Sequence, residues 1–370
     1  MLVALTEGKK SLVANKKLSK NKKYYCPSCK ARVYLKKGNV MRPHFAHYNK
    51  DNCSTFTEGE TEEHLKGKLA LAKYFEKQGY LVKIEAYLTE LKQRPDLLIE
   101  KNKQKIAIEF QCSSITIQKL TERTIGYFKA GYKVLWILGS HFHYHDSLTN
   151  LQKASLYYFS PTDTYLLVQY DTITQKIIVH HDFQVDAYGK MHCQKQSLIL
   201  NNPKKISLKS SKNQIEKIES SVWFFHAHGQ LTKSIRYPSL EIITFLSLIY
   251  QKNENIISIP IEIYIRVSTE WMIQTYHMNW KYQLLNWIES HSKKEIITKN
   301  SLWKWLEEKI KREEIVYSTI SGLKDKQLMK PHYEFLDSLV KNKRVKKLGS
   351  EKWSYRQAAK RFKNLEDKFK

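Results

Sequence analysis

The segment RPDLLIEKNKQKIAIEFQ, residues 94–111, carries side chains that suit metal-dependent chemistry on phosphodiesters. Period-two alternation places Glu109 and Gln111 on the same face of one predicted strand. Asp96 ends the neighbouring strand and can face them across a tight connection. Two carboxylates from adjacent strands, with the intervening backbone carbonyl, form an oxygen site for Mg²⁺ or Mn²⁺. Such a metal polarises a phosphate and lowers the pKa of a bound water, so the segment predicts a nuclease.

Position 111 holds glutamine where many metal-dependent nucleases have lysine. Gln111 can hold a water but has no positive charge to stabilise an attacking hydroxide. We expect slower hydrolysis with metal binding retained, because the metal supplies most of the electrostatics. His64 and Lys66, near the start of the preceding helix, could partly replace the missing charge. Glu63 could add a third carboxylate, although Glu62 and Glu63 also suit a helix N-terminus.

A second group of potential metal ligands lies near the N-terminus. The pairs Cys26-x2-Cys29 and His44-x2-His47 offer two thiolates and two imidazoles, a set that tetrahedral zinc accepts. In so small a segment the metal would substitute for a hydrophobic core. Cys53 could replace one of the histidines. The alternative is that the histidines pack structurally while the thiols stay free.

Hydrophobic periodicity predicts the elements that must position the carboxylates. Apolar residues at helical spacing are followed by alternating strands, a crossover helix and a buried apolar strand. The order is α-β-β-β-α-β, an α/β sandwich with a parallel crossover. The expected elements are a helix over 61–79, strands over 81–88 and 105–111 with the strand that Asp96 ends between them, a helix over 114–131, a strand over 132–138 and a hairpin over 165–181.

The chain is long enough for several domains. We expect a small N-terminal zinc-hairpin module over 1–55, a central α/β domain over 56–200 and a mostly helical, basic domain over 214–370. A polar linker is expected over 201–213, and the tryptophans beyond it should lie in the core because their spacing is helical. The segment 332–356 reads as a helix followed by a basic hairpin, a pattern that includes winged helices.

Charge is the strongest compositional signal. Lysine and arginine total 63 against 36 acidic residues, for a formal net charge of +27, and residues 1–50 contain a single acid, Glu7. Such surfaces suit a protein that neutralises phosphates. Five cysteines favour a reducing compartment over a disulfide framework. With no long apolar stretch and no secretory signal, we expect a cytoplasmic protein without a membrane span.

Taken together, six segments resemble the competence protein CoiA family, whose middle domain is nuclease-like and belongs to the PD-(D/E)XK superfamily. They are CPSC…HFAH, EEHLKGK, RPDLLI, IEFQCSSIT, ERTIGYF and VLWIL, in this order. The resemblance is strong over residues 1–200, implies a restriction-endonuclease-like core, and extends to the glutamine at position 111. It implies a catalytic set of Glu63, Asp96, Glu109 and Gln111. Arg123 and Tyr127, one turn apart on the crossover helix, become candidate substrate-binding or pocket-shaping residues.

The family resemblance also implies a biological role, the recombination of incoming single-stranded DNA into the chromosome during transformation. The implied partners are single-stranded or branched DNA, the strand-exchange recombinase and other competence proteins. Two other classes of function stay open. One is a catalytically silent DNA-binding adaptor that assists the recombinase. The other is a transcription regulator, which rests on the winged-helix pattern at 332–356 alone. The carboxylates favour the enzyme.

Overall fold

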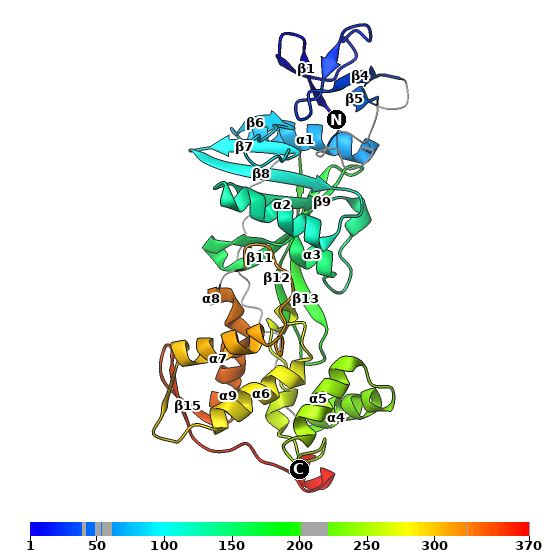
Figure 1. The fold of residues 1–370 in the computed structure, drawn as a ribbon. Helices are drawn as coiled ribbons and strands as arrows, with labels where there is room; N and C mark the ends of the chain where they lie inside the picture. The colour runs from blue at the N-terminus through cyan, green and yellow to red at the C-terminus, as the bar shows by residue number, and fades with distance from the viewer. Residues whose placement is uncertain (39–41, 49–52, 54–60, 201–220, 324, 370) are drawn as a thin grey trace. The chain divides into compact units, whose positions relative to one another are not determined.

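The computed structural model describes all residues except 39–41, 49–52, 54–60, 201–220, 324 and 370 (Figure 1). The chain divides into two compact units. The first comprises Met1–His181 with Gln194–Ser210, and the second comprises Asp182–Cys193 with Ser211–Lys370. The linker predicted over 201–213 lies outside the described residues. Within the described part of the chain, no helix has the length and apolar content needed to cross a bilayer.

The first unit begins with a small antiparallel sheet, which we call the N-terminal module. Its strands run in the order β2-β1-β3-β4-β5. They are β1 (Val3–Thr6), β2 (Ser11–Val13), β3 (Tyr24–Tyr25), β4 (Arg32–Lys36) and β5 (His44–His47). The apolar core is small and includes Tyr24, Val33 and Phe45, together with the buried Cys26. The sequence led us to expect a metal in place of a core, and the module has a small apolar core that includes one of the expected metal ligands, Cys26.

The rest of the first unit is built around a mixed sheet of eight strands. The main path is β13-β12-β11-β9-β8-β7-β6, and β10 pairs with β11. The strands are β6 (Leu81–Ile84), β7 (Leu97–Lys101), β8 (Gln104–Gln111), β9 (Lys133–Leu138), β10 (Tyr157–Phe159), β11 (Thr164–Asp171), β12 (Lys176–Val185) and β13 (Met191–Ile199). Strand β8 pairs antiparallel with β7 and parallel with β9. The mixed α/β class and the predicted parallel crossover are therefore confirmed.

Helices cover both faces of this sheet at strand β8. Helix α1 (Glu62–Lys77) packs on the face that carries Ile108 and Phe110. Helices α2 (Ile117–Lys129) and α3 (Asn150–Ala154) pack on the opposite face, which carries Ala107. Short 3-10 turns follow at Ser140–Phe142 and Ser160–Thr162. The predicted alternation of β8 is confirmed, because its two faces join different cores.

One predicted strand is shorter than expected. The pattern LVKIEAYL predicted a strand over 81–88, but β6 ends at Ile84. Glu85 follows with a φ of +50°, in the left-handed region that ends a strand. The alternation of apolar and polar residues after Ile84 therefore does not reflect a strand. The carboxylate of Glu85 is buried, and it becomes important for the site described below.

The second unit is mostly helical around one large core. Its helices are α4 (Ser221–Arg236), α5 (Leu240–Tyr250), α6 (His277–Glu289), α7 (Lys299–Lys311), α8 (Asp325–Leu328), α9 (Lys330–Lys341) and α10 (Leu365–Phe369), with 3-10 turns at Ile261–Tyr264 and Glu270–Met272. Trp280 of α6 is buried in this core, as the helical spacing of the tryptophans predicted, and Trp353 is buried there too. The end of the β12–β13 hairpin also belongs here, since Trp271 donates from its indole nitrogen to the Phe183 carbonyl at 3.1 Å.

A three-stranded sheet accompanies the last helices of the second unit. Its strands β14 (Ile296–Thr298), β15 (Val345–Gly349) and β16 (Lys352–Tyr355) lie in the order β14-β16-β15, with antiparallel pairing throughout. With α6, α7 and α9, the order helix–strand–helix–helix–strand–strand is that of a winged helix. Helix α9 presents the exposed Asp337, which pairs with Lys347 at 3.0 Å. An acidic side chain on this helix does not favour binding of the helix to DNA, because DNA phosphates are negatively charged.

Candidate functional site

Close packing of α1 on β8 creates the environment of Asp96. A Cβ atom on Gly67 would lie 2.0 Å from the Phe110 ring, so only glycine permits this approach. The N-cap Thr61 accepts the His64 amide through its side chain and fixes the start of the helix. One face of α1 therefore presents His64 and Lys68 to the start of β7.

The Asp96 carboxylate is held by two hydrogen bonds and an ion pair. Its Oδ2 atom accepts the Phe110 backbone N–H at 2.8 Å and lies 3.1 Å from His64 Nε2. Its Oδ1 atom lies 3.5 Å from Lys68 Nζ. Burial by itself raises the pKa of Asp96, but the facing cations and the donated N–H hold that pKa well below its ordinary value. Asp96 is therefore ionised at neutral pH.

The Glu109 carboxylate faces α2 on the other side of the sheet. Its Oε1 atom accepts the Tyr127 hydroxyl at 2.5 Å and also an N–H from Arg123. Arg123 further donates to the Arg94 carbonyl at 3.3 Å, which fixes the guanidinium. Among the described residues no donor is bonded to Glu109 Oε2, so this oxygen is left for another ligand. Burial raises the pKa of Glu109, and the charge of Asp96 adds to the rise while Arg123 opposes it.

The other two residues expected in the catalytic set lie near this end of the sheet but are engaged elsewhere. Glu63 accepts the Ser140 backbone N–H at 2.8 Å and the Ser140 hydroxyl at 2.9 Å, just beyond β9. The side-chain amide of Gln111 donates to the Ser113 carbonyl at 2.7 Å. Glu63 thus ties α1 to the loop after β9, and Gln111 stabilises the loop after β8.

The sequence pointed to the wrong lysine of α1 as a source of positive charge. Lys66 lies on the surface and pairs with Glu62 at 2.7 Å, one helical turn away. Lys68 is instead fully buried, and its Nζ atom lies 2.5 Å from Glu85 as well as near Asp96. Its position three residues after Leu65, on the apolar face of the helix, is the signal that could have identified it. Glu85 gave no comparable signal, because its pattern read as a strand.

The N-terminal module brings together four potential metal ligands: Cys26, Cys29, His47 and Cys53. Their ligand atoms all lie within 4.8 Å of one another, the only such group of three or more among the described residues. The Sγ atoms of Cys26 and Cys53 are 3.9 Å apart, and Cys29 Sγ is 3.3 Å from His47 Nε2. Around a tetrahedral zinc, two sulfurs at ~2.3 Å would stand about 3.8 Å apart. The arrangement is compatible with structural zinc.

Strand alternation explains which histidine joins this cluster. His44 and His47 are three residues apart on β5, so they point to opposite faces. His47 is buried against the cysteines, whereas His44 bonds to the Arg42 carbonyl at 2.9 Å and lies outside the cluster. Cys53 stands in the position expected for His44. Burial lowers the pKa of His47, which favours the neutral imidazole that a metal requires.

Comparison with known protein families agrees with this architecture. The family described as "Competence protein CoiA, N-terminal domain" matches residues 8–56. The family described as "Competence protein CoiA, nuclease-like domain" matches residues 60–216. The chain belongs to the CoiA family. "Competence protein CoiA" of Bacillus subtilis (strain 168) is 33% identical over 125 residues, which cover 34% of this chain.

The match to this CoiA relative spans 33% of the relative's length, so it covers about a third of either protein. No solved structure matches the chain. The residues described above all fall within the two matched segments. The Cys/His cluster lies in the part that matches the CoiA N-terminal domain, and Asp96 and Glu109 lie in the part that matches the CoiA nuclease-like domain.

Proposed function

We propose that the protein is a metal-dependent nuclease of the PD-(D/E)XK type, which acts on DNA when incoming DNA is recombined during natural transformation. The observation that carries the proposal is a pair of carboxylates: Asp96, which directly precedes β7 and does not end a strand as expected, and Glu109 on the adjacent strand β8. The first is held ionised, and the second keeps one oxygen without a protein donor among the described residues. The family and the name of the Bacillus subtilis relative support the role in competence.

The carboxylate oxygens of Asp96 and Glu109 would hold a Mg²⁺ or Mn²⁺ ion. When bound, such an ion polarises the scissile phosphate and makes an attacking hydroxide available. The chain itself orients the two carboxylates, through the Phe110 amide for Asp96 and through the Tyr127 hydroxyl for Glu109. Arg123 is the cation nearest to Glu109 and would attract the phosphate of the substrate.

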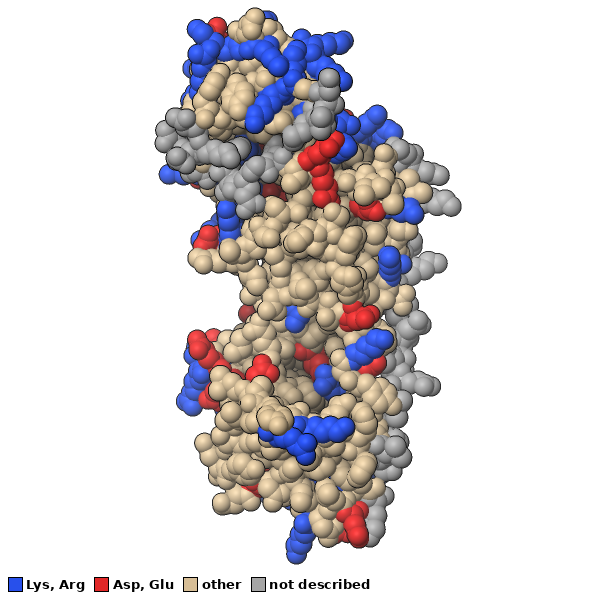
Figure 2. Space-filling model, turned by 90° about the vertical axis from the view of Figure 1, so that its right-hand side faces the viewer, with Lys and Arg blue, Asp and Glu red and all other residues tan. Residues whose placement is uncertain are grey.

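The basic N-terminal module supplies a surface for the DNA backbone. Figure 2 shows lysine and arginine side chains crowded on this part of the molecule. The exposed cations include Lys9, Lys10, Lys16, Lys17, Lys20, Lys22, Lys23, Lys30, Arg32 and Lys36. A surface of this kind binds phosphates without reading sequence, and its affinity falls steeply as salt is added. The recombinase and other competence proteins are further proposed partners, supported by the family alone.

A second candidate function is a DNA-binding adaptor without catalysis. It is favoured by the residue at position 111, which is glutamine and not the lysine of many metal-dependent nucleases. The side-chain amide of Gln111 donates to the Ser113 carbonyl. The carboxylates would then serve only to hold Arg123, Lys68 and His64 in place. This candidate predicts DNA binding with no hydrolysis under any metal.

Cleavage by the purified protein separates the two candidates. Single-stranded, duplex and branched DNA are incubated with Mg²⁺ or Mn²⁺, and products are resolved by electrophoresis. We expect cleavage of at least one substrate, reduced about a hundredfold or more in Asp96→Asn and Glu109→Gln, because each removes a charged ligand. Glu122→Gln, an exposed change on α2, serves as the matched control. Cleavage that survives Asp96→Asn, or no cleavage by the unaltered protein, would overturn the nuclease proposal.

A further inference from the structure

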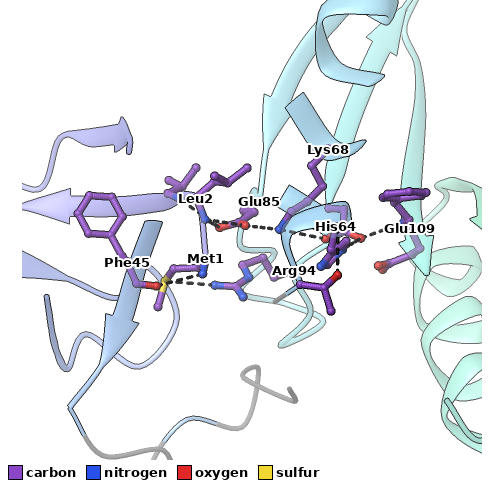
Figure 3. A network of polar contacts seen from close by, with 12 residues as sticks. Met1, Leu2, Phe45, His64, Lys68, Glu85, Arg94 and Glu109 are labelled. Atoms are coloured by element: carbon purple, nitrogen blue, oxygen red, sulfur yellow. Dashed lines mark hydrogen bonds and ion pairs between the residues drawn. The ribbon is translucent and has the colours of Figure 1, made fainter. Parts of the chain in front are cut away.

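A chain of polar contacts leads from the N-terminal module through Glu85 to Lys68 (Figure 3), and Lys68 in turn faces Asp96. Its central member is Lys68, whose side chain has 0% exposure. The Lys68 ammonium lies 2.5 Å from Glu85 Oε1 and 3.5 Å from Asp96 Oδ1. One cation thus stands between the buried carboxylate of Glu85 and the half-buried carboxylate of Asp96. Burial of such a set is costly unless the geometry is good, so its members are fixed relative to one another.

Glu85 is in turn held by the backbone of the N-terminal module. The Leu2 N–H lies 2.8 Å from Glu85 Oε1 and 2.9 Å from Oε2, and the Val3 N–H donates to Oε2 at 3.0 Å. The left-handed conformation of Glu85 ends β6 and allows the carboxylate to meet these amides. The backbone N–H of Glu85 also donates to the Asp96 carbonyl at 2.9 Å. Glu85 and Asp96 are therefore joined twice, once through Lys68 and once through the backbone.

The same stretch of the module is tied to the strand that carries a cluster ligand. The Phe45 amide donates to the Met1 carbonyl at 2.8 Å, and the Ala14 amide donates to the Leu2 carbonyl at 2.8 Å. Phe45 belongs to β5, which also carries His47 of the Cys/His cluster. Contacts thus run without a break from the cluster, through β5 and the start of β1, to Glu85, Lys68 and Asp96.

We propose that Lys68 and Glu85 are positioning residues for Asp96, and that the N-terminal module keeps them in place through the Leu2 and Val3 amides. The module is then a structural part of the carboxylate site as well as a DNA-binding surface. Lys68 acts through Asp96 and does not contact the substrate. The effect on cleavage rests on the proposed nuclease function, whereas the effect on the orientation of Asp96 does not.

Hydrogen exchange at single amides provides a measurement that is independent of activity. The Phe110 amide reports on Asp96, because it donates to that carboxylate, and the Leu2 and Val3 amides report on Glu85. The informative protein is Glu85→Gln/Lys68→Met, which removes both buried charges together and so avoids an unpaired ion. Lys68→Met alone is compared with it. Lys73→Met, an exposed change on the same helix, is the matched control.

We expect exchange at Phe110, Leu2 and Val3 to become about tenfold faster or more in the double variant, with Trp136 in β9 unchanged. Where cleavage is measurable, kcat should fall by about a hundredfold with KM for DNA within about twofold, as for a misplaced catalytic group. Lys73→Met should match the unaltered protein in both measurements.

Two results would overturn the proposal. Unchanged exchange at Phe110 in the double variant would mean that Lys68 and Glu85 form an isolated ion pair with no hold on Asp96. Faster exchange at Phe110 with unchanged exchange at Leu2 and Val3 would mean that the N-terminal module does not help to position Asp96. An absence of cleavage by the unaltered protein would instead refute the nuclease function and leave the exchange results to decide this proposal.

Discussion

The Cys/His cluster and the carboxylate pair differ in what neutralises their charge. In the cluster, four ligand atoms stand within 4.8 Å of one another at distances close to the edges of a zinc tetrahedron. At the carboxylate pair, protein side chains already face both acids: Lys68 and the His64 imidazole face Asp96, and Arg123 faces Glu109. The geometry of the cluster is compatible with zinc, whereas the carboxylate pair already has protein partners and keeps only Glu109 Oε2 without a donor among the described residues.

If the carboxylate pair holds the proposed Mg²⁺ or Mn²⁺, the two sites are of different kinds. A buried cluster of thiols that gathers around one point gains its stability from the metal, as structural zinc sites do. An acid that is already paired would give up part of that pairing to a divalent ion, so the proposed ion would bind weakly and exchange. Weak, exchangeable binding suits Mg²⁺ in catalysis, since Mg²⁺ usually shares its coordination with water and substrate phosphates.

The largest expected effect comes from removal of thiolates from the cluster. Cys26→Ser/Cys29→Ser should lower zinc affinity by about a thousandfold or more, because two of four ligands are lost. The module should then lose its cooperative unfolding, while the central sheet retains its own. Zinc content by atomic emission and thermal unfolding measure the two effects. His44→Ala is the control, since His44 lies outside the cluster. If the variant binds no zinc and its N-terminal module still unfolds cooperatively, the four residues are part of an ordinary small core and not a zinc site.

Acid should weaken zinc binding strongly and in a predictable direction. Burial raises the pKa of the Cys26 thiol to about 12, so without metal this thiol is protonated throughout the range from pH 6 to 8. Zinc must displace that proton when it binds. The proton on Cys26 therefore lowers the zinc affinity about tenfold for each unit by which the pH falls. Competition with a chelator at several pH values gives the slope. A flat profile would show that Cys26 is not a ligand.

A smaller effect is expected from removal of the cation that competes for Glu109. Arg123→Met should make Mn²⁺ bind about tenfold more tightly, because the metal no longer competes with a guanidinium for the carboxylate. Cleavage should nevertheless fall, since the cation that attracts the phosphate is also lost. Titration calorimetry measures the Mn²⁺ affinity, and the cleavage assay measures the loss of activity. Lys129→Met, exposed at the end of α2, is the control. Weaker Mn²⁺ binding in Arg123→Met would mean that Arg123 supports the metal site.

The elements around the carboxylates could be predicted because periodicity determines which face of a strand or helix is buried. The alternation in β8 placed Glu109 opposite the face of Phe110, and the spacing of Arg123 and Tyr127 brought both to Glu109. Glu85 could not be predicted, because its role depends on a left-handed backbone and on amides more than eighty residues earlier in the chain. Lys68 lies on the apolar face of α1, a signal that was overlooked because its partner Glu85 could not be predicted.

The second unit illustrates the same limit of local patterns. The sequence predicted a helix followed by a hairpin, and α9, β15 and β16 are found there. The pairing of β14 with β16 joins residues more than fifty positions apart, which no local pattern encodes. The exposed acid on α9 and its partner Lys347 also emerge only in three dimensions. They make the transcription-regulator function the least supported of the three considered.

The most direct test of the account is Mn²⁺ binding to zinc-loaded protein, followed by electron paramagnetic resonance. We predict one Mn²⁺ per chain in the unaltered protein, with affinity lowered about a hundredfold or more in Asp96→Asn/Glu109→Gln, because both charged oxygen ligands are removed. Glu122→Gln should leave the titration unchanged. Equal Mn²⁺ binding by the unaltered protein and the double variant would contradict a metal at this carboxylate pair.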